Sequence, residues 1–138
     1  MVYTLKLEIV TPEAKTYSDD VEMVTLPGIE GEMGIYPQHV PLMTQLTPGE
    51  ITVRKNGQDT YLAVGEGFVE IAGDSVAVLT DMAIPSDQID EAQAEEARRK
   101  AEARLAEKIT ADEAALIQAS LSRSLVQLNV KRRHHARK

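Results

Sequence analysis

The chain contains no cysteine, no tryptophan and no long apolar run. The absence of cysteine excludes a disulfide scaffold and thiol chemistry, and it fits a reducing compartment. No stretch approaches the roughly 20 apolar residues that a membrane-spanning helix needs, so we expect any membrane role to depend on partner proteins. The N-terminal sequence "MVYTLKLEIV" lacks the basic and then apolar segments of a secretory signal. A length of 138 residues allows one ordinary core, or one small domain with an appendage.

Charge is divided unevenly along the chain. Residues 1–88 carry four basic and fourteen acidic side chains, whereas residues 89–138 carry eleven basic and eight acidic ones. This opposition indicates two segments with different roles. The aromatic residues all lie far from the basic C-terminal cluster in the sequence, so no stacking surface for nucleic acid accompanies it. An acidic protein partner explains the cluster as well. After Glu113 no acidic residue follows, and the remaining cations are Arg123, Lys131, Arg132, Arg133, Arg137 and Lys138.

Residues 1–85 have the pattern of short strands joined by tight turns. Asn56-Gly57 is the dipeptide preferred in type I′ hairpin turns, because both residues tolerate a positive φ. Gly73-Asp74 fits a type II′ turn between two further runs of strand-forming residues. Regular turn signals of this kind predict a β-sandwich or barrel. The first strand has apolar residues at every second position, namely Tyr3, Leu5, Leu7 and Ile9.

Residues 86–138 have the pattern of two helices. Glycine disappears after residue 85, alanine becomes abundant, and Thr110 and Glu113 form a capping-box sequence that starts the second helix. The short connection predicts an antiparallel hairpin. The first helix offers mainly methyl groups to its partner, so we expect its packed-down state to be only slightly preferred. The two predicted apolar stripes are Ala94, Ala97, Ala101, Leu105 and Ile109, and then Ala114, Ile117, Leu121, Leu125 and Leu128.

The segment "LPGIEGEMGIYPQHVPL" (26–42) is the most distinctive part of the chain. It lacks the lysine of a phosphate-binding P-loop, and its acidic residues would repel phosphate. The alternatives are a rigid irregular connection or a stiff recognition loop that presents Glu32, Met33 and His39 outward. A lone histidine is poor support for a metal site, and we identify no catalytic constellation in the chain. His134 and His135 lie in the basic tail, where we expect them to be solvated.

This segment, the later "GEGFVEIAGDSVAVLTDMA" and the alanine-rich helical pair together resemble the ε subunit of bacterial F-type ATP synthases. The resemblance covers nearly the whole chain. It implies an N-terminal β-sandwich (1–85) and a C-terminal two-helix hairpin (86–138). It also implies a non-catalytic rotor subunit of the central stalk of this proton-transporting enzyme. Such a subunit is peripheral, lies at the cytoplasmic face of the bacterial inner membrane, and reaches the membrane only through its partner subunits.

The resemblance further assigns roles to particular residues. Glu32, Met33 and His39 correspond to positions that face the c-ring, and Thr11 corresponds to a position near the γ subunit. We expect Glu32 and His39 to share one exposed surface at one end of the sandwich. In the family the hairpin either folds against the sandwich or extends along γ to inhibit ATP hydrolysis. Its cations would then meet an acidic segment of the catalytic β subunits, and here they are Arg123, Lys131, Arg132 and Arg133.

An alternative function is an ATP-sensing regulatory subunit whose hairpin binds the nucleotide. Some ε subunits use an Ile/Leu-Asp-x-x-Arg-Ala motif for this purpose, and Asp90 matches its aspartate. Gln93 stands where that motif has arginine. Arg123 matches a second ATP-contacting arginine, but Gln127 replaces a third. The loss of two guanidinium groups argues against ATP as a cofactor. A free-standing sandwich adaptor is a third reading, which the full-length resemblance disfavours.

Overall fold

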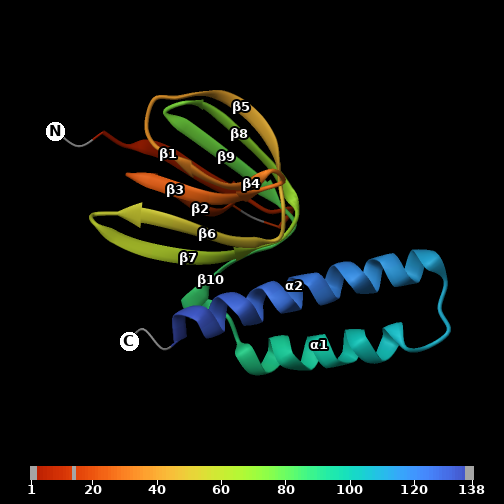
Figure 1. Cartoon of the computed structure of the whole chain (residues 1–138). Coiled ribbons are helices and arrows are strands. Elements are labelled where there is room, and N and C mark those ends of the chain that lie inside the picture. Colours follow the sequence, from red (N-terminus) through yellow and green to blue (C-terminus); the bar gives the residue numbers. More distant parts are fainter. Residues whose placement is uncertain (1–2, 14, 136–138) are drawn as a thin grey trace.

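The computed structural model describes residues 3–13 and 15–135, without the side chains of residues 15, 16 and 135. Arg137 and Lys138, two of the tail cations, lie outside this range. Figure 1 shows a β-sandwich followed by two antiparallel helices that lie along one side of it. The predicted fold class is therefore confirmed, and the hairpin is in its folded-down state.

Within the described residues, ten strands build the sandwich, and Figure 1 shows them in two layers. One layer contains β10, β7, β6, β3 and β4, and the other contains β5, β8, β9, β1 and β2. The layers are joined where β3 pairs with β5, between Gly28 and Leu46. Strands β1 and β9 pair in parallel, and the other pairs are antiparallel. The strands are β1 (Leu5–Val10), β2 (Lys15–Val21), β3 (Met23–Gly28), β4 (Gly31–Ile35), β5 (His39–Leu46), β6 (Gly49–Lys55), β7 (Gln58–Val64), β8 (Gly67–Gly73), β9 (Ser75–Thr80) and β10 (Ala83–Pro85).

The core lies between the two layers and follows from the period-2 pattern of the strands. Leu5, Leu7 and Ile9 of β1 are fully buried, as their alternation predicts. The opposite layer supplies equivalent residues, among them Val24 and Leu26 of β3. The two sets of inward-facing side chains exclude water from the space between the sheets.

Glycine is required at specific points of this frame. Asn56 and Gly57 have φ values of 54° and 74°, which confirms the predicted turn between β6 and β7. At Gly67 a Cβ atom would lie 1.8 Å from the backbone oxygen of Leu79. Strands β8 and β9 can approach so closely at this point only because residue 67 has no side chain.

Helix α1 (Glu91–Leu105) and helix α2 (Ala111–His135) follow a short 3₁₀ helix η1 (Ser86–Gln88). Asp90 caps α1 by accepting a hydrogen bond from the backbone N–H of Gln93 at 3.0 Å. The capping box before α2 is formed: the Glu113 N–H donates to the Thr110 hydroxyl, and the Thr110 N–H donates to the Glu113 carboxylate. Both helix starts thus follow from local sequence.

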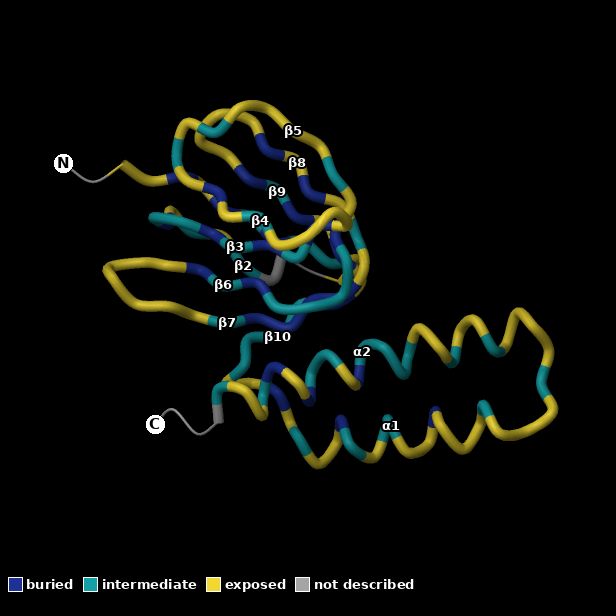
Figure 2. The backbone as a smooth tube through the Cα atoms, viewed as in Figure 1, coloured by how far each residue is buried: buried dark blue, intermediate teal, exposed yellow. Residues whose placement is uncertain are grey.

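The predicted stripe of α2 is only partly correct. Leu128 is buried, but Leu125 is 40% exposed, and Ser124 is buried instead. Helix α2 packs against α1 on one side and against the sandwich on another, so its buried residues cannot form one narrow line. Figure 2 shows that the buried positions of the hairpin lie where α2 meets the sandwich and where α1 faces α2, while the far tip of the hairpin is largely exposed.

Candidate functional site

A second apolar cluster joins the hairpin to the sandwich. Ala63 of β7 and Val130 of α2 are buried in it, together with Met82 and Ile89. Val126 packs against its edge from α2. Since Leu62 and Val64 point into the main core, Ala63 lies on the opposite, outer face of β7, which α2 covers. We call this contact the docking pad (Ala63, Met82, Ile89, Val126 and Val130).

Polar contacts surround the docking pad. The Arg123 guanidinium lies 3.5 Å from the Asp81 carboxylate, which follows β9. The Lys131 ammonium donates to the backbone oxygen of Ser86 at 3.2 Å. Both α2 cations therefore bind groups on or next to the sandwich when the hairpin is folded down.

Arg132 has a different role, because it connects the two helices. Its guanidinium donates to Glu91 at 2.9 Å and to Glu95 at 3.1 Å, both on α1. Hydrogen bonds donated by Arg98 and then by Arg132 hold the pKa of Glu95 below its usual value. The hydrogen bonds that Arg132 donates to Glu91 and Glu95 raise the pKa of Arg132. The contact stabilises the hairpin itself rather than its attachment to the sandwich.

The end of α2 contradicts the expectation of a solvated tail. The His134 side chain is only 10% exposed, and its Nε2 lies 2.6 Å from an oxygen of Glu50 on β6. Its ring stacks on Tyr61 with centroids 3.5 Å apart and an angle of 9° between the planes. Arg133 contacts the other Glu50 oxygen at 3.3 Å. Folding thus brings an aromatic ring and acidic groups to the basic C-terminal cluster, although these groups lie far from it in the sequence. The side chain of His135 is outside the part of the chain that the structure describes.

The predicted c-ring residues are not grouped as expected. Glu32 is exposed beside the β3–β4 turn and lines a cleft of about 280 Å³ with Arg133 of α2. His39 instead begins β5 at the other end of the sandwich, paired with Gly73. The expectation of one shared end is wrong, because β4 and residues 36–38 carry the chain from one end to the other between them. Met33 does not point outward either: it is half-buried and packs against the main core.

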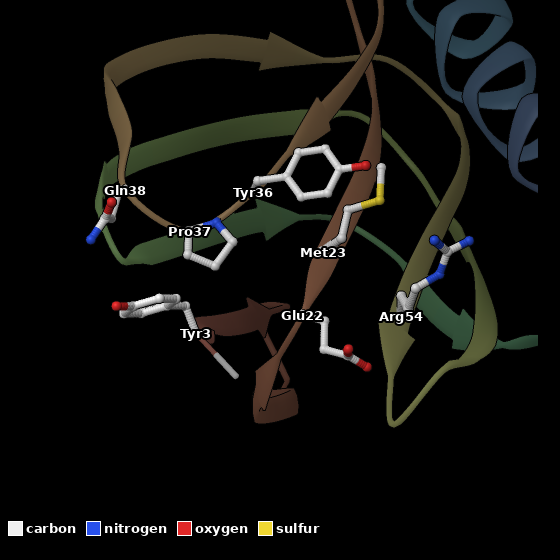
Figure 3. Close-up of a pocket in the computed structure, with 7 residues that line it drawn as sticks. All are labelled: Tyr3, Glu22, Met23, Tyr36, Pro37, Gln38 and Arg54. Atoms are coloured by element: carbon white, nitrogen blue, oxygen red, sulfur yellow. The ribbon is translucent and has the colours of Figure 1, made fainter. Parts of the chain in front are cut away.

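A hollow of about 440 Å³ lies beside the His39 end of the sandwich. Figure 3 shows Pro37 between the rings of Tyr3 and Tyr36 on its wall. Gln38, with a φ of 67°, donates its N–H to the Asp74 carboxylate at 2.7 Å, which fixes this connection. The predicted stiffness of the segment therefore has a structural basis. The lining residues are Tyr3, Glu22, Met23, Tyr36, Pro37, Gln38 and Arg54.

The outer face of the second layer carries an exposed apolar row that the sequence analysis missed. Phe68 of β8 is directly opposite Leu79 of β9, which is opposite Val10 of β1. Phe68 is 60% exposed and Leu79 is 55% exposed. Thr11 lies beside this row and lines a hollow of about 370 Å³ with Val10 and Leu79. The sequence signal for this row was the presence of Phe68 and Leu79 at positions where the alternation of the strands predicts a polar, outward-facing residue. We call Val10, Phe68 and Leu79 the apolar row.

The positions matched to an ATP site have other contacts in the folded-down hairpin. Asp90 caps α1, whereas Arg123 contacts Asp81. The Gln127 amide lies 3.2 Å from the Met82 sulfur. Within the described part of the chain, no helix is long and apolar enough to cross a membrane, and no group of three or more histidine or acidic side chains is placed to hold a metal ion.

Comparison with known proteins agrees with this architecture. Residues 4–86 match the beta-sandwich domain of the ATP synthase Delta/Epsilon chain, and residues 87–132 match its long alpha-helix domain. The chain is 45% identical over 130 residues to the ATP synthase epsilon chain of Chloroflexus aggregans, with 94% of each chain covered. It is 46% identical over 134 residues to the epsilon chain of Dehalococcoides mccartyi, covering 95% of this chain and 96% of that one.

A chain in the cryo-EM structure of the Euglena gracilis mitochondrial ATP synthase has the same fold, with a TM-score of 0.72 and 24% identity. The alignment covers 95% of this chain and 82% of that chain. The two domain matches and the full-length identity to bacterial relatives confirm the resemblance seen in the sequence. The chain belongs to the epsilon subunits of ATP synthase.

Proposed function

We propose that this epsilon chain is a non-catalytic part of the rotating central stalk, bound to the γ subunit and the c-ring at the cytoplasmic face of a bacterial inner membrane. The apolar row carries this proposal. The hairpin covers β6 and β7 on the outer face of the first layer, whereas Phe68 and Leu79 lie exposed on the second layer. Adjacent exposed apolar side chains of this kind are typical of protein interfaces.

The apolar row and the neighbouring Thr11 form the proposed γ surface. The proposed c-ring contacts are Glu32 and His39, which lie at opposite ends of the sandwich and would therefore meet different parts of the ring. Met33 is not a proposed c-ring contact, because it packs against the main core. The stiff connection at residues 36–38 supports a role in transmitting torque, since a rotor contact must not yield under load.

The hairpin is the proposed brake on ATP hydrolysis. In its folded-down state, the solvent-exposed guanidinium groups of Arg123 and Arg133 bind carboxylates, and ion pairs at the surface contribute only about 0–1 kcal/mol each. An acidic surface on the catalytic β subunits can compete for the same cations. The exchange of one set of carboxylates for another allows α2 to leave the sandwich without leaving its charges unpaired.

The test is the ATPase activity of complexes reconstituted with the full-length subunit or with a subunit that lacks residues 114–138. We expect the deletion to raise ATP hydrolysis. A Gln58→Ala subunit, changed at an exposed position at the start of β7 and outside the hairpin, is the control and should behave as wild type. Equal rates for the full-length and shortened subunits would contradict the brake and leave only the docking role.

We also propose that ATP is not a cofactor of this chain. Neither Gln93 nor Gln127 supplies a cationic donor, and Asp90 is already used as the cap of α1. Phosphate groups prefer charge-assisted hydrogen bonds, which these amides cannot provide.

A further inference from the structure

The last turn of α2 is held on the sandwich by a contact unlike the other tail contacts. The Glu50 and His134 side chains are 15% and 10% exposed, whereas the Arg133 side chain is 64% exposed. The imidazole is enclosed between Tyr61 and Glu50, from which it gains a stacking contact and a hydrogen bond. A buried hydrogen bond to a carboxylate is screened by salt much less than an exposed ion pair.

The two partners of His134 form a platform on adjacent strands. Glu50 of β6 is opposite Ala63 of β7, and Thr52 is opposite Tyr61. Glu50 and Tyr61 are therefore diagonal neighbours on the same outer face of the sheet. The platform belongs to the rigid sandwich, and it lies directly beside Ala63 of the docking pad.

We propose that His134 is the latch residue of the folded-down hairpin, with Glu50 and Tyr61 as its receptor on the sandwich. Helix α2 leaves the docking pad only after the imidazole leaves this receptor. The charged and titratable groups that face the ring are Glu50, Tyr61 and Arg133, the last through the shared carboxylate. The Nδ1 atom is buried and has no hydrogen-bond partner among the described residues, so the stacking and the single Nε2 contact hold the ring.

Arg132 provides a matched comparison for the latch. It lies two residues before His134 and also forms hydrogen bonds with carboxylates, but both of these are on α1. Its removal weakens the contact between the helices and leaves the contact with the sandwich in place. A general effect of removing a tail side chain that binds a carboxylate would change both variants, whereas a latch requires His134 in particular.

The absence of cysteine makes undocking directly measurable on the full-length chain. A single cysteine at Ala63, which is buried under the hairpin, reacts with a soluble thiol reagent only when the docking pad opens. A single cysteine at Val64, the next residue on β7 and part of the main core, reacts only when the sandwich itself opens. The two reporters separate undocking of the hairpin from loss of the fold.

In the Ala63→Cys background, we expect His134→Ala to raise the labelling rate about tenfold or more, because one hydrogen bond to a charged group and one stacking contact are lost. Arg132→Ala should change the rate less than about threefold. His134→Gln keeps a hydrogen-bond donor and His134→Phe keeps the stacking ring, so both should give intermediate rates. Glu50→Gln should add little to His134→Ala, because the two residues act as one pair.

Similar labelling rates for the His134→Ala and Arg132→Ala variants would overturn the latch. A parallel rise at the Val64→Cys reporter would also overturn it, since that result would show a general loss of stability. The effect of the latch on ATP hydrolysis rests on the proposed function, but the labelling experiment uses the isolated chain. A failed brake would therefore leave the labelling result unchanged, and a failed latch would leave the truncation result unchanged.

Discussion

Phe68 is the residue of the apolar row whose removal should affect docking most. A phenylalanine has about 200 Å² of accessible surface, so the 60% exposure of Phe68 leaves about 120 Å² for a partner to cover. Replacement by alanine removes about two thirds of this area. At roughly 25 cal/mol per Å² the loss is about 2 kcal/mol of binding free energy, or about a 30-fold weaker Kd for γ.

The measurement is titration calorimetry of the Phe68→Ala chain with the γ subunit. The free energy of unfolding of the isolated variant should change by less than about 0.5 kcal/mol, because the ring lies outside the core. Gln58→Ala serves as the control, since Gln58 is exposed on β7 of the first layer, away from the apolar row and outside the hairpin, and should leave γ binding unchanged. If the Phe68→Ala chain binds γ as tightly as wild type, the proposed γ surface is wrong.

Two further predictions concern the frame and the nucleotide. Gly67→Ala should lower the free energy of unfolding in urea by more than about 3 kcal/mol, because its Cβ meets the Leu79 backbone, whereas Gly57→Ala has open space and should cost only about 1–2 kcal/mol for its φ of +74°. Equal costs would show that β8 and β9 separate easily. Gln93→Arg should strengthen ATP binding about 10- to 100-fold in calorimetry, and a micromolar dissociation constant for wild type would contradict the predicted lack of ATP binding.

Local features of the fold could be predicted from the sequence because their causes are local. The burial of Leu5, Leu7 and Ile9 follows from a two-residue period, and the positive φ of Asn56 follows from the turn chemistry of its dipeptide. The Thr110 capping box likewise needs only its own four residues. Each of these features depends on neighbours within a few positions of the chain.

The contacts of the basic tail could not be predicted in this way. Glu50 and His134 are separated by 84 positions, and their meeting depends on where α2 lies across β6 and β7. The sequence shows only that no acidic residue follows Glu113, and this absence predicts that the cations of the C-terminal tail are unpaired. The fold supplies the missing partners from the sandwich and from α1. The inward packing of Met33 could not be predicted for the same reason. It depends on the pairing of β4 with β3, which sets the face of the sheet on which Met33 lies.

The contacts of Arg123, Arg133 and His134 with the sandwich also determine how salt should affect the proposed inhibition by the hairpin. Added salt weakens the exposed Arg123 and Arg133 pairs of the folded-down state, and it equally weakens the proposed attraction to acidic β subunits. The folded-down state alone retains the docking pad and the buried contact of His134, neither of which salt screens strongly. Rising ionic strength should therefore favour the folded-down state.

We expect inhibition of ATP hydrolysis by the full-length subunit to relax as the salt concentration rises from about 0.1 M to about 0.3 M, a range in which the Debye length falls below ~10 Å. Labelling of the Ala63→Cys reporter in the isolated chain should change little over the same range. The complex with residues 114–138 deleted corrects for the effect of salt on the catalytic subunits. Stronger inhibition at higher salt would mean that exposed ion pairs, rather than the docking pad and His134, hold the hairpin down.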